Sequence, residues 1–311
     1  MQTEKIKILK QTLGQYQRQG KEYLFACPKC NHHKRKLSVN LNKNCFKCWV
    51  CDYSGRKISR LIRSFGTFFD YKEWRKFDNE IELSEFDKLL EVFQEEGEPT
   101  LSLPEEFTSL VGDKILFSSL NARKYLKDRG VSKMDIQKYM IGHCTKGKYE
   151  DYVVVPSFNM QGDVNFFVSR NYKGGWPNYL NPRVPKNKII FNELFIDFHQ
   201  EITVVEGVFD AIKAGNNSVP LLGSSFSEES KLFQKIVLYD TPVYLALDRD
   251  AEAKSIKIIK KLLNYGIEVY KVDTSGFRDV GEMTKEQFKK RKEDAMLMDQ
   301  ENTLLYEVLS V

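Results

Sequence analysis

The chain of 311 residues is long enough for one large domain or two small ones, and 41% of its residues are hydrophobic, 13% aromatic and 29% charged. This composition is typical of a globular protein and excludes a disordered chain or a disulfide-dense secreted module. No run of about 18 apolar residues is present, which excludes a membrane-spanning helix. The N-terminal segment lacks the apolar core of a secretory signal. We therefore expect a cytoplasmic protein with no membrane partner.

The net charge of +5 is unevenly distributed along the chain. Residues 1–65 carry 15 Lys and Arg against 3 Asp and Glu, whereas residues 78–98 carry 9 acidic residues against Lys88 alone. Lysine and arginine gain affinity for a polyanion because they release counterions from its phosphates. The basic N-terminal segment therefore favours a nucleic-acid partner, with a merely solvated basic face as the alternative.

Five of the six cysteines lie between residues 27 and 51. Two C-x2-C pairs separated by 17 residues can each direct two thiolates at one ion, which predicts a closed, structural, tetrahedral zinc site. Cys45 offers a competing C-x2-C pair with Cys48, and His32 or His33 could replace one ligand. The preferred ligands of this single zinc ion are Cys27, Cys30, Cys48 and Cys51.

The zinc segment is also predicted to bind nucleic acid. A short hairpin of residues 36–41 and 44–48 is expected between the two cysteine pairs, with its turn at residues 42–44. Cations for phosphates and aromatic faces for bases are the combination used by single-strand binders, and Lys36 and Trp49 are the candidate contacts. At least one of the aromatic residues is expected to fill the small core under the zinc instead. The aromatic residues are Phe46, Trp49 and Tyr53.

Residues 57–65 predict a helix that closes this segment, and the acidic stretch that follows is expected to be a linker, partly helical around residues 86–93. Residues 118–144 predict two short helices, the first ending at Gly130 and the second capped by Ser132. Strands are expected at residues 152–158 and 164–170.

Carboxylates follow two apolar strands further along the chain. One strand ends in Glu206-Gly207 and the other in Asp248-x-Asp250, and a helix is expected after each. Ligands of open α/β sheets gather at the carboxyl ends of strands, and residues two apart in a strand point to the same side. Converging carboxylates repel one another unless cations join them, and hard oxygen ligands suit Mg²⁺. A pair of such ions would serve phosphoryl transfer, while ordinary helix capping is the alternative.

These motifs together resemble the DnaG-type primases of bacteria and bacteriophages, which have an N-terminal zinc ribbon and a catalytic Toprim core. The resemblance covers residues 20 to about 285, and the segments 125–142, 177–182, 221–227 and 276–283 are similar to family signatures in the same order. Cys30 resembles the form found in small phage primases that work with a separate helicase. Gly281 stands where the family commonly has a second late aspartate, so Glu282 is expected to substitute for it.

The resemblance implies roles for individual residues. The implied catalytic residues are Glu206, Asp210, Asp248 and Asp250. The implied ligands of two or more Mg²⁺ ions are Glu206, Asp248, Asp250 and Asp279. The implied basic ridge that holds template and nucleotide phosphates consists of Arg170, Lys186 and Lys188.

The expected fold class is α+β or α/β with several domains: a zinc ribbon and a mixed α/β RNA polymerase core that contains a Toprim fold. The expected function is DNA primase, which makes RNA primers from ribonucleoside triphosphates on single-stranded DNA by two-metal nucleotidyl transfer. A RecR-like recombination mediator and a Toprim nuclease are the alternatives. No G-x4-GK[ST] motif occurs in the sequence. The resemblance to small phage primases implies a separate replicative helicase as partner, and the apolar C-terminal end could dock on it or pack on its own core. Whether the ribbon acts on its own catalytic core or on a neighbour's stays open.

The expected boundaries are a zinc-ribbon template-binding domain at residues 1–65, a linker at 66–105, the N-terminal part of the core at 106–200, the Toprim subdomain at 201–285 and a helical tail at 286–311.

Overall fold

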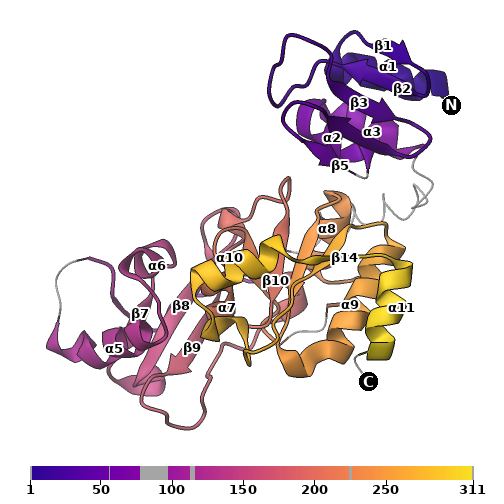
Figure 1. Ribbon diagram of the computed structural model, residues 1–311. Coiled ribbons are helices and arrows are strands. Elements are labelled where there is room, and N and C mark those ends of the chain that lie inside the picture. Colours follow the sequence, from indigo (N-terminus) through magenta and orange to yellow (C-terminus); the bar gives the residue numbers. More distant parts are fainter. Residues whose placement is uncertain (1, 56, 78–96, 113–115, 224–225, 310–311) are drawn as a thin grey trace. The chain divides into compact units, whose positions relative to one another are not determined.

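The computed structural model describes residues 2–55, 57–77, 97–112, 116–223 and 226–309 (Figure 1). The chain divides into two compact units, Met1–Glu91 and Val92–Val311. None of the helices in the described ranges is both long and apolar enough to cross a membrane.

The first unit is built on an antiparallel sheet with the strand order β1-β2-β3-β4-β5. β3 and β4 form the expected hairpin, in which Leu37 lies opposite Cys48 and Asn40 opposite Cys45. The Asn40 side chain accepts hydrogen bonds from the backbone N–H groups of Asn42 and Lys43, which fixes the predicted turn. The strands are β1 (Gln17–Gln19), β2 (Glu22–Phe25), β3 (Leu37–Asn40), β4 (Cys45–Cys48) and β5 (Ser54–Gly55).

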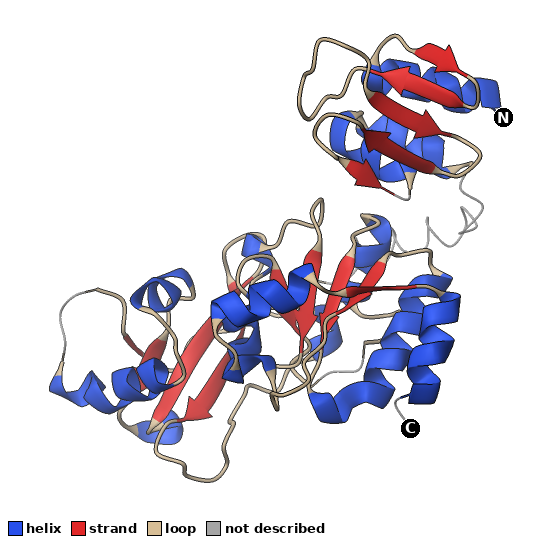
Figure 2. Cartoon of the chain, viewed as in Figure 1, coloured by secondary structure: helices blue, strands red, loops and turns tan. Residues whose placement is uncertain are grey.

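Helices cover one face of this sheet, and in the view of Figure 2 they lie behind the strands. Strand side chains alternate between faces, and the apolar set on one face, with Phe25 and Leu37 fully buried, packs with helix residues such as Leu61 and Trp74 in one core. The opposite face carries the polar side chains of the same strands. The helices are α1 (Gln2–Leu13), α2 (Ile58–Phe65), which is the predicted closing helix, and α3 (Phe68–Arg75).

The first unit extends beyond the boundary expected from the sequence. A capping box between Thr67 and Asp70 starts α3, and the buried side chains of Tyr71 and Trp74 join the core of the unit. Residues 66–77 therefore belong to the first unit rather than to a linker. The helix expected around residues 86–93 lies outside the described residues.

The second unit begins with an antiparallel sheet of order β6-β7-β8-β9. Both expected strands are confirmed, as are the two short helices: Gly130 has φ +66° just after the first, and Ser132 forms a capping box with Asp135 at the start of the second. The elements are β6 (Thr108–Ser109), α5 (Leu120–Asp128), α6 (Lys133–Lys138), β7 (Gly142–Cys144), β8 (Tyr152–Phe158) and β9 (Val164–Asn171).

A second sheet in this unit has the order β11-β10-β12-β13-β14. The first four strands of that order are parallel and β14 is antiparallel to β13. Val205 at the end of β10 pairs with Ala246 at the end of β12, so the chain leaves both strands at the same edge of the sheet. The strands are β10 (Ile202–Val205), β11 (Ser218–Pro220), β12 (Val243–Ala246), β13 (Val269–Lys271) and β14 (Met296–Met298).

The short helix α7 (Val208–Ala214) joins the two sheets. Its Val208, Phe209 and Ile212 pack into the core under β8 and β9, whereas Ala211 packs into a second core with residues of β10 and β12. The residues at the start of α7 therefore lie where the two halves of the unit meet. The other α-helices described here are α8 (Lys231–Leu238), α9 (Glu252–Asn264), α10 (Lys285–Glu293) and α11 (Gln300–Leu309).

The C-terminal helix α11 packs on its own unit. Thr303 is buried, and the Tyr306 hydroxyl donates a hydrogen bond to the Glu252 carboxylate at the start of α9. Of the two positions expected for the tail, the described part adopts the one on its own core.

Candidate functional site

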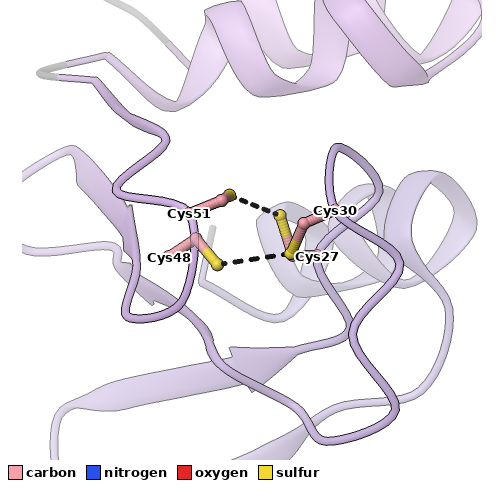
Figure 3. A group of neighbouring side chains, drawn as sticks. All are labelled: Cys27, Cys30, Cys48 and Cys51. Atoms are coloured by element: carbon pink, nitrogen blue, oxygen red, sulfur yellow. Dashed lines mark hydrogen bonds between the residues drawn. The ribbon is translucent and has the colours of Figure 1, made fainter.

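The four predicted zinc ligands form one cluster (Figure 3). Their sulfur atoms all lie within 4.8 Å of one another. The Sγ atoms of Cys27 and Cys51 are 3.8 Å apart, and those of Cys30 and Cys48 are 3.9 Å apart. A tetrahedron of sulfurs around zinc at 2.3 Å has edges of about 3.8 Å, whereas a disulfide would bring two sulfurs to about 2.05 Å. The geometry matches a zinc-thiolate site.

The alternative ligands lie outside this cluster. Cys45 sits on β4 at the rim of a groove on the polar face of the sheet. The His32 ring accepts the backbone N–H of Lys34 at 3.1 Å, and its centroid lies 4.3 Å from that of the His33 ring. The sequence preference for the Cys48-x2-Cys51 pair is confirmed.

The electrostatics of the thiols favour a bound cation. Burial raises the pKa of the Cys27 thiol to about 12. Burial acts in the same direction on Cys48, but hydrogen bonds from the backbone N–H groups of Cys51 and Val50, together with those from the Cys51 and Cys27 thiols, lower its pKa to about 7. Four clustered thiols cannot all ionise without a cation between them, and zinc supplies that charge.

The polar face of the first unit carries an aromatic ring beside cations. Trp49 is 67% exposed, and the Lys47 ammonium lies 5.2 Å from the centroid of its ring. Both residues line a groove of about 450 Å³ together with Lys43 and Glu22. Lys36 is exposed, and its carbonyl accepts the backbone N–H of Trp49 at 2.9 Å. Phe46, by contrast, is buried, so it is one of the aromatic residues that fill the core.

Four carboxylates line a single cavity of about 520 Å³ in the second unit. Glu206 follows β10, Asp210 lies in the first turn of α7, and Asp248 follows the end of β12. Asp279 precedes the 3₁₀ turn η6 (Val280–Glu282). The cavity therefore collects four of the five acidic residues assigned to the site from the sequence.

Asp250 is the exception. β12 ends at Ala246, and residues 249–251 form the 3₁₀ turn η5 (Arg249–Ala251), so strand alternation does not apply to Asp248 and Asp250. The expectation that alternation points both side chains into one site is wrong for this reason. Asp250 is exposed and lines a neighbouring cavity beside Phe277, while remaining close enough to raise the pKa of Asp248.

Asp210 acts as a clamp between two segments. Its Oδ2 accepts the backbone N–H of Gly207 at 2.9 Å, and its Oδ1 accepts that of Gly281 at 2.8 Å. A Cβ at position 281 would lie 3.0 Å from Asp210 Oδ1 and 3.2 Å from Asp279 Oδ1, which explains a glycine there. The Glu282 carboxylate instead accepts the backbone N–H of Arg278, and Glu282 is not among the residues that line the cavity.

The carboxylates repel one another. Burial, followed by the Asp279 carboxylate, raises the pKa of Asp210 to about 6. Burial, followed by Asp210 and then Glu206, raises the pKa of Asp248 to about 7. Within the described part of the chain, the buried Oδ1 of Asp248 has no hydrogen-bond partner. A partnerless carboxylate oxygen among other carboxylates fits a hard divalent cation such as Mg²⁺.

A lysine neutralises Glu206. The Nζ atom of Lys254, in the first turn of α9, lies 3.0 Å from Glu206 Oε2 and 3.2 Å from Oε1. The Lys254 side chain is 34% exposed and that of Glu206 19%. The sequence did not single out Lys254, because 48 residues separate the partners.

Arginines share the cavity with the carboxylates. The Arg170 guanidinium lies 4.4 Å from the centroid of the Tyr179 ring, and its buried Nε has no partner among the described residues. Arg129 lies 4.9 Å from the centroid of the Phe209 ring. Guanidinium groups held in place by aromatic rings suit the oxygens of phosphate groups. The sequence indicated Arg170, whereas Arg129 was missed, although it directly precedes the glycine that ends α5.

The two predicted lysines of the basic ridge do not line this cavity. The Lys186 ammonium donates to the carbonyl of Leu222 at 2.8 Å, and Leu222 itself lines the cavity in a left-handed conformation with φ +56°. Lys186 thus supports a wall of the site. Lys188 lies half-buried at the end of the 3₁₀ turn η3 (Lys186–Lys188).

Comparisons with known proteins agree with this division into two units. Residues 2–75 match the model of the CHC2 zinc finger family. The DNA primase of Thermotoga maritima is 25% identical over 374 aligned residues, covering 99% of this chain and 62% of the relative. The DNA primase of Clostridium acetobutylicum is 22% identical over 333 residues, covering 87% of this chain and 52% of the relative.

Solved structures give a further comparison. A DnaG primase catalytic domain, solved with bound single-stranded DNA, aligns with a TM-score of 0.50 at 20% identity, over 58% of this chain and 74% of that chain. The first unit is therefore a zinc-binding CHC2 ribbon with four cysteines, and the expected fold class of zinc ribbon plus mixed α/β core is confirmed. The chain spans about half to three fifths of the length of the curated relatives it matches.

Proposed function

We propose that the protein is a DNA primase that joins ribonucleoside triphosphates into short RNA on a single-stranded DNA template. The observation that carries this proposal is the cavity in which Glu206, Asp210, Asp248 and Asp279 lie beside Arg129 and Arg170. Carboxylates for metal ions beside guanidinium groups for phosphates are the components that phosphoryl transfer requires. The relatives named DNA primase support the same conclusion and do not favour the recombination-mediator alternative.

The proposed magnesium ligands are Glu206, Asp248 and Asp279, with Asp250 at the edge of the site. When bound, Mg²⁺ would lower the pKa of the attacking 3′-hydroxyl and offset charge on the transferring phosphoryl group. Asp210 holds the loops that carry the ligands in register through its bonds to Gly207 and Gly281. We therefore assign Asp210 the role of positioning the loops that carry the metal ligands, rather than the role of a metal ligand.

The arginines would orient the incoming nucleotide. Arg170 is braced by Tyr179, and Arg129 by Phe209, so each guanidinium is fixed before a triphosphate arrives. Fixed donors stabilise developing negative charge without the cost of reorganising at the moment of reaction. Lys186 would act indirectly by supporting Leu222, and Lys188 remains a candidate for contacts with template phosphates outside the cavity.

The zinc ribbon would bind the template. Trp49 offers an exposed face for one base, while Lys36, Lys43 and Lys47 supply charge for the backbone. The DNA bound in the solved primase catalytic domain makes single-stranded DNA the natural ligand to test.

Three finer assignments follow from the sequence motifs. We propose that the β10–β13 sheet is a Toprim core, on the basis of the acidic residues after β10 and β12. Cys30 as second zinc ligand favours the subtype of small phage primases, which act in the cytoplasm of the host with a separate replicative helicase. The ribbon would then serve either its own core or that of a neighbouring molecule.

The test is incorporation of labelled ribonucleotides on a pool of single-stranded DNA templates with Mg²⁺. Wild type should make short RNA, and Glu206→Gln should reduce the rate by about 100-fold because it removes one proposed ligand charge. Glu229→Gln makes the same chemical change at an exposed position and should keep full activity. RNA synthesis by Glu206→Gln at the wild-type rate would reject the assignment of the site.

A further inference from the structure

The proposed reaction gives no role to the Lys254–Glu206 ion pair at the carboxylate cavity. Both carboxylate oxygens of Glu206 lie within 3.2 Å of the same ammonium nitrogen. Among the four cavity carboxylates, Glu206 is the one with a described lysine contact. Asp279 pairs with the exposed Arg278 at 3.4 Å, Asp210 binds backbone N–H groups, and Asp248 Oδ1 has no described partner. The cation therefore sits on the carboxylate that follows β10.

The start of α9 that carries Lys254 is fixed in place from the other side. The carboxylate of Glu252 forms an ion pair with Lys271 at 3.4 Å and accepts a hydrogen bond from Tyr306 of α11. The Lys271 side chain is only 4% exposed, and its ammonium also lies 3.4 Å from the Ser255 hydroxyl. These contacts anchor the helix turn on both sides of residue 254, so Lys254 reaches Glu206 from a fixed base.

A lysine at this position is unfavourable for the helix itself. The N-terminal turn of a helix carries partial positive charge, which stabilises acidic side chains such as Glu252 and opposes a cation. Glu206 offsets this cost, because its carboxylate lies against the ammonium. The arrangement links the presence of Lys254 to the carboxylate site rather than to the stability of α9.

Resting on the proposed function, we propose that Lys254 competes with the divalent cation for the carboxylate of Glu206. A metal ion that took both Glu206 oxygens would displace the ammonium, since both cations need the same lone pairs. Lys254 neutralises Glu206 while the metal is absent and sets the metal concentration at which the site fills. Lys254 is thus a positioning residue that acts through Glu206.

The test measures metal binding directly. Free Mn²⁺ is followed by electron paramagnetic resonance during titration of the zinc-loaded full chain, without nucleotide or template. Lys254→Met removes the charge and keeps most of the side-chain volume, so it should bind Mn²⁺ about tenfold more tightly than wild type, which corresponds to about 1.4 kcal/mol. Lys254→Arg keeps the charge and should bind Mn²⁺ as wild type does. Lys257→Met removes an exposed charge from the same helix and should leave the affinity unchanged.

A double variant shows whether the effect passes through Glu206. In the Glu206→Gln background, Lys254→Met should no longer tighten Mn²⁺ binding, because the shared carboxylate is gone. A structural ion pair alone would change the unfolding temperature of Lys254→Met and leave its Mn²⁺ affinity as in wild type. Unchanged or weaker binding by Lys254→Met would overturn the proposal, as would an equal gain in the Glu206→Gln background.

This outcome is separable from that of the proposed function. A tenfold shift in Mn²⁺ affinity together with no RNA synthesis by wild type would contradict the polymerase assignment and keep the competition between Lys254 and metal. RNA synthesis by wild type with no effect of Lys254→Met on Mn²⁺ binding would support the polymerase assignment and reject the competition between Lys254 and metal.

Discussion

Two clusters of candidate metal ligands, one in each unit, are assembled in different ways. The zinc ligands lie within 25 residues of sequence, on two tight turns whose backbone N–H groups point at the sulfurs. The carboxylates come from separate segments between residues 206 and 279. They meet because β10 and β12 end at the same edge of a sheet and because Asp210 binds the Gly281 backbone next to Asp279. The first cluster belongs to the core of its unit, since Cys27 and Cys48 are buried in it.

This difference separates an ion expected to stabilise the fold, zinc, from the divalent cation proposed for the chemistry. The buried thiols have to be joined by zinc for the small core of the first unit to form. The carboxylate cavity is instead supported by two apolar cores and by its own cations, Lys254 and the arginines. The second unit should therefore stay folded without a divalent cation.

The largest effect is expected from loss of zinc. Cys27→Ser should release zinc and unfold the first unit, because structural zinc contributes about 10–16 kcal/mol in small zinc domains. Hydrogen exchange read peptide by peptide should show lost protection in residues 2–75 and retained protection in residues 202–271. Cys45→Ser is the matched control and should keep one zinc per chain by metal analysis. Retained protection in zinc-free Cys27→Ser would contradict a structural role for zinc in the first unit.

The next prediction distinguishes Asp248, a proposed metal ligand, from Asp210, which holds two loops together by hydrogen bonds. Asp248→Asn should lower the rate of RNA synthesis by about 100-fold, with no loss of thermal stability, because it removes a repelled charge. Asp210→Asn should lower both, since an amide cannot accept both the Gly207 and the Gly281 N–H groups. Thermal unfolding in magnesium-free buffer and the synthesis assay measure the two properties. Equal stability losses for the two variants would contradict the distinction.

A smaller effect is expected on template binding. Trp49→Ala removes an exposed ring beside Lys47 and should weaken binding of single-stranded DNA by about tenfold, since stacking of one base contributes about 1–3 kcal/mol. Phe69→Ala removes an aromatic ring that is 77% exposed on α3 of the same unit and serves as the control. Fluorescence anisotropy of a labelled oligonucleotide at fixed salt measures both. The assignment fails if the two variants bind alike.

The smallest effect concerns pH and the fold of the second unit. Burial, followed by the charge of Arg123, lowers the pKa of His143 below its usual value. The unfolded chain therefore binds a proton more readily than the folded chain, and stability should fall as the pH drops below about 6.5. His143→Leu should flatten this part of the curve of unfolding temperature against pH. A curve that stays as steep in the variant would assign the pH dependence to other groups.

Features that depend on neighbouring residues in the sequence could be predicted, whereas contacts between distant segments could not. The cysteine spacing, the hairpin, the helix caps at Gly130 and Ser132 and the strands before Glu206 and Asp248 are local patterns, and the structure contains each of them. Strand alternation gave a wrong prediction at Asp250, because β12 ends at Ala246 and residues 249–251 form a 3₁₀ turn.

The sequence did not predict contacts between side chains that are far apart along the chain. Lys254 meets Glu206 across 48 residues, and the Gly281 N–H meets Asp210 across 71. The burial of Trp74 shows the same limit, since an acidic flank suggested a linker where α3 packs on the first unit. Such contacts depend on how helices and strands are placed relative to one another. A local residue pattern predicts a single helix or strand and not this placement.

The most direct test of the proposed polymerase activity follows template and product in one reaction. A single-stranded DNA template with a fluorescent 5′ end is incubated with wild type, Mg²⁺ and radiolabelled ribonucleoside triphosphates, and both labels are resolved on one gel. A primase should make short RNA complementary to the template and leave the template at its full length. Shortened template without RNA would contradict it and identify the carboxylate cavity as that of a nuclease.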